Sequence, residues 1–178
     1  MPVVRLEAEV IRDAILAVSG RLDWTMYGPS VPTHLTSFME GRGRPGVSGP
    51  LDGNGRKSIY LAVRRNFPNP FLLAFDAPQP NSTIGRRNVS NVPAQALCLL
   101  NDPFVLEQAA TWATRVLTGS ADNRERIRTL YRVGFGREPQ AGEVLDALEF
   151  LGADSRETHV WAELCHVLLN SKEFIFIK

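Results

Sequence analysis

Lysine is scarce in this chain, and net charge is nearly absent. Three lysines stand beside seventeen arginines, and nineteen acidic residues leave a formal net charge of +1. A nearly neutral protein has no global field to attract nucleic acid or an anionic membrane, so we predict no nucleic-acid partner. The arginine fork suits paired recognition of carboxylate, phosphate or sulfate, and a high-GC genome is the simpler explanation of the same bias.

Cysteine is scarcer still. Cys98 and Cys165 both fall within apolar helical patterns, which is typical of buried free thiols, and the sequence leaves open whether they are paired. The chain contains no Cys-x-x-Cys-His motif, so it attaches no c-type haem. Three scattered histidines supply no metal-ligand set. We therefore predict neither a metal nor a cofactor in this chain.

Long hydrophobic runs are also missing. No apolar stretch approaches the length of a membrane-spanning helix, so we predict no membrane span. The N-terminal stretch MPVVRLEAEVIRDAILAV mixes charged and apolar residues, which predicts an amphipathic helix and no signal peptide. Apolar content of 44% and charged content of 22% are ordinary for a globular protein whose 178 residues bury a sizeable core.

The N-terminal half predicts one helix followed by irregular chain. Apolar spacing indicates a helix over residues 5–19 that stops at Gly20. Residues 24–54 are rich in glycine and proline, which excludes a helix and predicts a long loop. The run KSIYLAV at 57–63 has the composition of a short strand, and proline-interrupted irregular chain follows to about residue 89.

From residue 91 onward the sequence predicts helices with short connections. Asn91 is the expected cap of an apolar helix with Pro93 in its first turn, and Asp102-Pro103 ends that helix and starts the next. Further helices are expected up to Gly119 and over 122–136, 140–151 and 157–169. The tail FIFIK is expected to form an edge strand or an apolar plug.

These patterns predict a mainly α fold. It consists of a C-terminal bundle of about five short helices, an N-terminal helix, and a long irregular arm with room for a small β-sheet. We assign residues 1–90 to the N-terminal helix and the basic arm, and residues 91–178 to the helical bundle, within one integrated domain. A structureless arm of this length indicates either function or disorder.

The best candidate site lies just before the predicted helix start at residue 91. Free backbone N–H groups and the positive end of the helix dipole favour an anion there, and two arginines add bidentate donors. The expected ligand is a carboxylate or sulfate of an anionic polysaccharide, or an acidic side chain of a partner. The alternative is that the arginines pair internally with Asp76 or with loop carbonyls. The candidate residues are Arg86, Arg87, Asn88, Ser90 and Asn91.

Four other polar residues of the same stretch are candidate accessory groups: Arg64, Arg65, Asp76 and Gln95. Asp76 would suit a general base if it were buried with a raised pKa, but no second carboxylate accompanies it at glycosidase spacing. Arg64 and Arg65 follow the predicted strand near aromatic residues, yet no nucleic-acid-binding motif matches. The sequence therefore identifies no catalytic residue.

Two segments resemble a known family. The first is RKSIYLAVRRN followed by PFLLAFDAPQPNSTIGRRNVSNVPAQALCLLNDPF, and the second is RIRTLYRVGFGREPQAGEVLDALEFL with WAELCHVLLNSKEF. Both resemble the C-terminal domain of planctomycete cytochrome c-containing proteins, a domain of unknown function. The resemblance is weakest at 25–54. It implies that this chain is the C-terminal part of a larger periplasmic or extracellular protein, with haem c in an upstream domain.

A more local similarity concerns the C-terminal helices. LYRxxxGRxP, a helix, and then NSxEF is the layout of small helical modules in bacterial extracellular proteins, where the arginine and the glutamate are structural. This similarity implies that Arg137 and Glu173 form an interhelical pair.

Two functions from different classes fit these observations. The first is a non-catalytic or accessory domain that packs against upstream domains of its parent and binds an anionic glycan or partner. The second is an arm whose arginines and aspartate complete a shared active site, in an enzyme or electron-transfer system acting on polysaccharide. Side chains that converge on an open pocket favour the second function, and side chains tied up in mutual hydrogen bonds favour the first.

Overall fold

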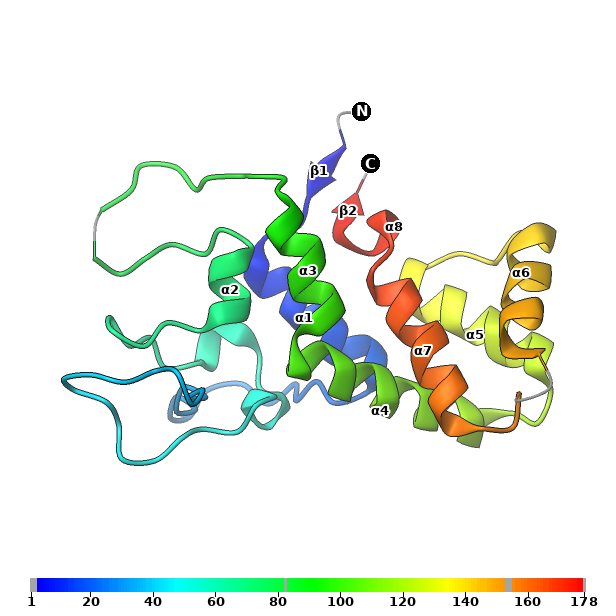
Figure 1. Ribbon diagram of the computed structural model, residues 1–178, viewed down its shortest axis with the longest axis horizontal. Coiled ribbons are helices and arrows are strands. Elements are labelled where there is room, and N and C mark those ends of the chain that lie inside the picture. Colours follow the sequence, from blue (N-terminus) through cyan, green and yellow to red (C-terminus); the bar gives the residue numbers. More distant parts are fainter. Residues whose placement is uncertain (1–2, 82, 153–154, 178) are drawn as a thin grey trace.

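The computed structural model describes residues 3–81, 83–152 and 155–177. Over these residues the protein has eight α-helices, two 3₁₀ helices and one two-stranded antiparallel sheet (Figure 1), which confirms the predicted mainly α class. The α-helices are Ala8–Ser19 (α1), Pro70–Ala74 (α2), Pro93–Asn101 (α3), Pro103–Gly119 (α4), Asn123–Phe135 (α5), Ala141–Leu151 (α6), Thr158–Leu169 (α7) and Lys172–Ile175 (α8). The other elements are η1 (Gly53–Gly55), η2 (Ser58–Tyr60), β1 (Val4–Arg5) and β2 (Phe176–Ile177).

Most helix boundaries follow the capping residues of the sequence. Gly20 ends α1 at φ 81° and Gly136 ends α5 at φ 68°, in the left-handed region that glycine adopts without strain. Asp102 accepts the backbone N–H of Phe104 at 2.9 Å at the start of α4, and the carboxylate of Asp122 caps α5 in the same way. Asn91 is not a cap: the residue before α3 is Val92, which makes no side-chain capping bond.

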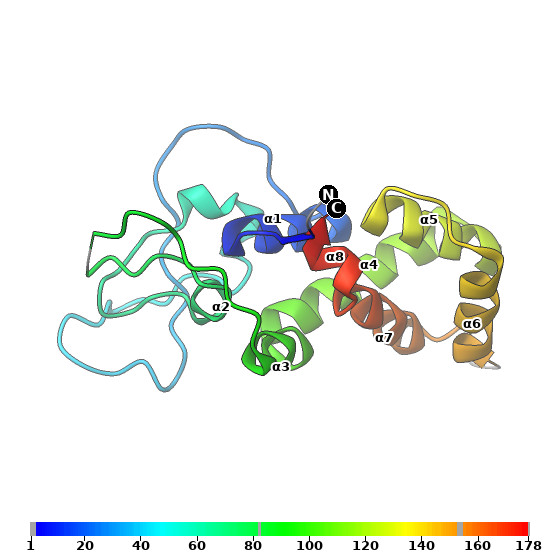
Figure 2. The ribbon, with the colours of Figure 1, turned by 90° about the horizontal axis from the view of Figure 1, so that it is seen from above.

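Helix α4 runs through the middle of the molecule. It packs most extensively against α7 and also contacts α1, α3 and α5, while the arm lies at one end of the long axis and α5 and α6 lie at the other (Figures 1 and 2). One apolar cluster extends from Ala8 to Phe174 and contains Trp112 and Trp161, which are 1% and 0% exposed. Burying roughly 150–250 Å² of each indole contributes about 4–6 kcal/mol before entropy is subtracted.

The two chain ends pair with each other. Val4 lies opposite Ile177 and Arg5 opposite Phe176 in the β1–β2 sheet, so the tail forms the expected edge strand (Figure 1). The short helix α8 precedes β2 and buries Phe174, which is 6% exposed. The first helix consequently begins at Ala8, and not at residue 5, because β1 occupies that position.

The strand expected at 57–63 is absent. Ser58–Tyr60 forms the 3₁₀ helix η2, and only Leu61 pairs with another segment, through an isolated bridge to Val31. Strand propensity mostly reflects packing against neighbouring strands, and here the segment has one bridge partner and no ladder.

The proline-interrupted chain before residue 89 contains a helix that sequence reasoning missed. Asn69 accepts the N–H of Leu72 at 3.1 Å, and Pro70 occupies the first helical position of α2. This is the same cap-and-proline signal that starts α4, but five residues give too little periodicity to detect. Phe71 and Phe75 of this segment are buried in the core.

Candidate functional site

Arg12 of α1 anchors the arm to the helical core. The residue is 2% exposed, and its Nη2 donates to the carbonyl of Asp52 at 2.7 Å. Its Nη1 donates to the carbonyl of Arg56 at 3.0 Å and to Ser58 Oγ at 3.1 Å, with the Asp13 carboxylate 3.3 Å away. Burial lowers the pKa of Arg12, and the neighbouring carboxylates of Asp13 and Asp52 oppose that shift. The guanidinium of one buried arginine thus provides hydrogen-bond donors for arm carbonyls that lie outside any β-ladder.

Two glycines allow the arm to approach this anchor closely. Gly53 has φ 63°, and a Cβ there would lie 2.6 Å from Arg12 Nη2. Gly55 has φ 71°, and a Cβ there would lie 2.0 Å from the carbonyl oxygen of Arg21. Any larger residue would strain the backbone and clash, so η1 requires glycine at both positions.

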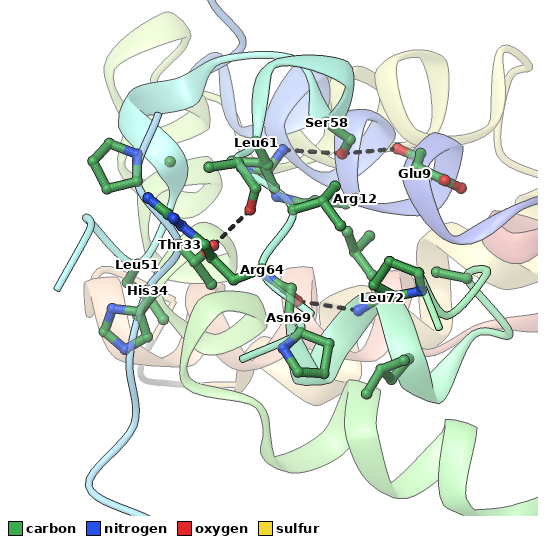
Figure 3. Close-up of a pocket in the computed structure, with 18 of the residues that line it drawn as sticks. Glu9, Arg12, Thr33, His34, Leu51, Ser58, Leu61, Arg64, Asn69 and Leu72 are labelled. Carbon is green, nitrogen blue, oxygen red and sulfur yellow. Dashed lines mark hydrogen bonds between the residues drawn. The ribbon is translucent and has the colours of Figure 1, made fainter. Parts of the chain in front are cut away.

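A cavity of about 120 Å³ lies between α1, α2 and the arm (Figure 3). A space of this order accepts one group about the size of a six-membered ring. Its apolar walls come from the arm and from α2, so long-range folding assembles it. The main apolar lining residues are Pro32, Leu51, Leu61, Leu72, Pro78 and Pro80.

Most polar groups of the cavity wall are engaged within the protein. Thr33 Oγ1 donates to the Ala62 carbonyl at 2.6 Å, and His34 Nδ1 lies 3.0 Å from the Gly49 carbonyl. Arg64 differs: it lines the cavity, is exposed, and its guanidinium forms no ion pair or hydrogen bond with the other residues that the structure describes. This side chain can therefore donate to a ligand at the cavity.

Arg87, the centre of the predicted anion site, is turned toward α1. Its guanidinium binds the Glu9 carboxylate at 2.8 and 3.1 Å and the Glu7 carboxylate at 3.0 Å. Burial acts to raise the pKa of Glu9, but the hydrogen bond and charge of Arg87 outweigh it and hold the pKa below its usual value. The donors of Arg87 are thus committed to a bridge between the arm and the first turn of α1.

Among the residues of the predicted anion site, Arg87 and Asn88 line a hollow of about 20 Å³ together with Asp76 and Arg5, and this volume holds about one water molecule. Arg86, Asn88 and Asn91 are exposed and form no hydrogen bond with the rest of the described chain. Ser90 faces Asp76, to which its backbone N–H donates at 2.8 Å. The structure therefore divides these residues between solvent and internal contacts.

Asp76 joins Ser90 and Gln95 in an internal cluster with Arg5. Arg5 Nη2 donates to Asp76 Oδ2 at 2.7 Å, and Ser90 Oγ donates to Asp76 and accepts from Gln95 Nε2 at 3.0 Å. Burial acts to raise the pKa of Asp76, but the hydrogen bonds from Ser90 and the charge of Arg5 outweigh this effect, so the pKa lies below its usual value. An ionised carboxylate with a lowered pKa is a weak general base and an effective structural partner.

At the opposite end of the molecule, Arg137 holds three segments together. Its guanidinium binds Glu143 of α6 at 2.7 and 2.8 Å and Glu173 of α8 at 2.6 and 2.8 Å. These carboxylates raise the pKa of Arg137 above its usual value. The contacts dock the C-terminal segment onto the α5–α6 connection.

The two cysteines are free thiols. Burial and the nearby Asp102 raise the pKa of Cys98 to about 12, and burial also raises the pKa of Cys165. Thiols in such surroundings are unreactive at neutral pH. Among the described residues, no three histidine, cysteine or acidic side chains gather closely enough to hold a metal ion.

Arg65 lies next to Arg64 in the chain but outside the cavity. It is exposed, and its side chain forms no hydrogen bond or ion pair with the residues that the structure describes. The two adjacent arginines therefore occupy different environments, which makes them a matched pair for experiment. None of the helices in the described ranges is both long and apolar enough to cross a membrane.

Arg5 and Arg12 are the functional-site residues that sequence reasoning missed. Both are arginines next to apolar residues in the first segment, and Arg12 lies between Ile11 and Ile15 on the buried side of α1. A charged residue within an apolar stripe was the available signal, since a buried charge requires partners.

Comparison with known proteins covers most of this architecture and ends before α7. A family model described as PSD1, a protein of unknown function (DUF1553), matches residues 1–151, which include every element from β1 to α6. No curated protein and no solved structure matches the chain. The match includes the Arg12 anchor, the cavity and the Asp76 cluster. The chain therefore belongs to the PSD1 family of proteins of unknown function (DUF1553).

Proposed function

We propose that this domain is a non-catalytic accessory domain that binds an anionic glycan in the cavity beside Arg64. The observation that carries the proposal is the pairing of an apolar, ring-sized cavity with one exposed guanidinium that has no partner in the described chain. Binding sites for small ligands commonly combine apolar walls with a few polar groups that fix orientation.

The chemistry of the cavity suits a charged sugar. The C–H face of one sugar ring packs against the leucine and proline walls, and its carboxylate or sulfate accepts paired hydrogen bonds from Arg64. Glu9 is the carboxylate in the wall, and Arg87 neutralises its charge, so repulsion of an anionic ligand is reduced. The cavity volume of about 120 Å³ limits the inserted group to a single ring.

The contacts of Arg87 and Asp76 support an accessory role over a shared active site. Arg87 is bound to Glu9, and Asp76 is bound to Ser90 and Arg5. The hollow that Arg87 and Asp76 both line has a volume of about 20 Å³, which is too small for a sugar ring. This is the arrangement that we expected of residues that fix the arm.

We also propose that the domain serves a larger exported, haem-associated protein of the planctomycete cytochrome c-containing type. The support is the resemblance of the segments around residues 56–104 and 126–174, together with the family match over residues 1–151. In such a parent, the domain packs against upstream domains and supplies a glycan contact. Haem chemistry would belong to those upstream domains.

Calorimetric titration at low salt tests the cavity. Oligogalacturonate and sulfated oligosaccharides are expected to bind, and a neutral cello-oligosaccharide is expected to bind more weakly. Arg64→Ala should lower the affinity about 10- to 100-fold, the value of one charge-assisted pair of hydrogen bonds. Arg65→Ala is the matched control and should bind like the unmodified protein. Absence of binding to every anionic probe, or equal affinities of the two variants, would refute the proposal.

A further inference from the structure

Large apolar side chains are exposed together in the loop after α1. Trp24 is 69% exposed, Met26 55% and Tyr27 81%, whereas the other two tryptophans, Trp112 and Trp161, are 1% and 0% exposed. Single exposed apolar residues are common on proteins, but a group of three within four residues marks an interaction surface.

Hydrogen bonds hold this loop in place. Arg56 donates from Nη1 to the Thr25 carbonyl at 3.1 Å and from Nη2 to the Tyr27 carbonyl at 2.6 Å. The Tyr27 backbone N–H donates to the Tyr60 hydroxyl at 2.7 Å, and the Thr25 N–H donates to Asp23 at 2.8 Å. The exposed rings are thus carried on a fixed backbone, which reduces the entropy that binding would cost.

The backbone at Tyr27 is strained. Its φ is 66°, in the left-handed region that bulky residues adopt rarely. The contacts from Arg56 and Tyr60 hold it there, and the Arg56 guanidinium also stacks 4.1 Å from the Tyr60 ring centre. In this conformation the Tyr27 side chain is exposed to solvent, three residues along the chain from Trp24.

A cation lies over the Trp24 ring. Lys57 Nζ is 4.9 Å from the Trp24 ring centre and 3.5 Å from Met26 Sδ. Arg56 is paired with Asp23, 3.6 Å away, but Lys57 forms no ion pair with any described carboxylate. The surface therefore combines open aromatic area with one uncompensated positive charge.

We propose that Trp24 and Tyr27 form a stacking platform for sugar rings of an anionic glycan, and that Lys57 meets the carboxylate or sulfate of the stacked sugar. This inference rests on the proposed function and adds a second subsite outside the cavity. A sugar ring has an apolar face and a polar rim, which matches aromatic rings flanked by Asp23 and Thr25.

The size of the platform argues against a protein partner. A stable protein interface buries about 800 Å² on each side around an apolar core. Here three apolar side chains are bordered by polar and glycine residues, such as Asp23, Thr25 and Gly28. One or two sugar rings would cover an apolar area of this size. A folded protein partner would need a larger surface, and most of that surface would be polar loop.

One segment serves both subsites. Ser58 and Leu61 line the cavity (Figure 3), while Lys57 and Tyr60 of the same segment contact the platform loop. The two subsites therefore share residues of η2 and its immediate flanks. This arrangement suits a glycan chain of several sugars, and not a single monosaccharide.

Tryptophan fluorescence tests the platform directly, because Trp24 is the exposed indole and the other two are buried. We expect oligogalacturonate or a sulfated oligosaccharide to protect the protein from acrylamide quenching. Trp24→Ala removes the reporting indole, so its binding is followed by calorimetric titration and should be about tenfold weaker. Lys57→Gln should weaken binding of the charged probes only. Phe38→Ala is the control, because Phe38 is 93% exposed and lies outside the platform. Thermal melting confirms that each variant is folded.

The outcomes separate the platform from the cavity. Binding that Arg64→Ala weakens and Trp24→Ala leaves unchanged, without protection of the indole, overturns the platform and leaves the proposed function standing. Absence of any glycan binding overturns both. Self-association of the unmodified chain that Trp24→Ala abolishes, without glycan protection, would assign this surface to a second copy and overturn the glycan.

Discussion

Replacing Arg12 with methionine keeps most of the side-chain volume and removes the charge that anchors the arm. The substitution leaves the carbonyls of Asp52 and Arg56 and the hydroxyl of Ser58 without their buried donor. It also leaves Asp13 without its counter-charge. Removing one partner from a buried charged network costs about 3–5 kcal/mol. At about 2–4 °C per kcal/mol for a chain of this size, the melting temperature should fall by about 6–20 °C.

Thermal and urea denaturation followed by circular dichroism measure this loss. Arg65→Met is the control, because an exposed arginine without a described partner should change stability by no more than about 0.5 kcal/mol. Limited proteolysis of the Arg12 variant should cut first within residues 24–54, because the arm loses its anchor while α4 and α7 stay packed. A loss below about 1 kcal/mol for Arg12→Met, with an arm as resistant as that of the control, would refute the reasoning.

Two further perturbations test the rest of the arm. Asp76→Asn should destabilise the protein at pH 7 by about 1.5–3 kcal/mol in urea melts. Hydrogen bonds from Ser90 hold the pKa of Asp76 below 3.8, so the stability that ionised Asp76 contributes is present above that value and is lost as pH falls through the lower, folded-state pKa. The free energy of unfolding of the Asn variant should therefore fall less steeply at acidic pH than that of the unmodified protein. An unchanged acid dependence would contradict this. Gly55→Ala should lower the free energy of unfolding by more than about 1 kcal/mol, because its Cβ would meet the Arg21 carbonyl at 2.0 Å. Gly142→Ala, in open space on a helix, is the control and should raise that free energy by about 0.5–1 kcal/mol. Equal melting temperatures of the two variants would refute the argument.

The sequence alone determined the six longer helices and several of their ends, whereas the short helices α2 and α8 were missed. Helical spacing and caps act within a few residues, so Gly20, Asp102 and Asp122 could be assigned without knowledge of the tertiary structure. The same local information indicated the glycine-rich loop over residues 24–54, and it left the C-terminal tail as an edge strand or an apolar plug, of which the structure shows the strand. The segment at 57–63 was misassigned because strand formation depends on a neighbouring ladder, which is not encoded locally.

Only the tertiary structure decided what the polar residues of the arm do. Arg87 binds Glu9, 78 residues away, and Asp76 binds Arg5, 71 residues away, so neither partner could be read from spacing. The cavity beside Arg64 likewise depends on segments that meet only in the folded chain. The sequence determined which groups carry charge and which segments are helical, because propensity and capping are local. The fold decided which charges are neutralised and which remain available to a ligand, because pairing and burial depend on distant contacts.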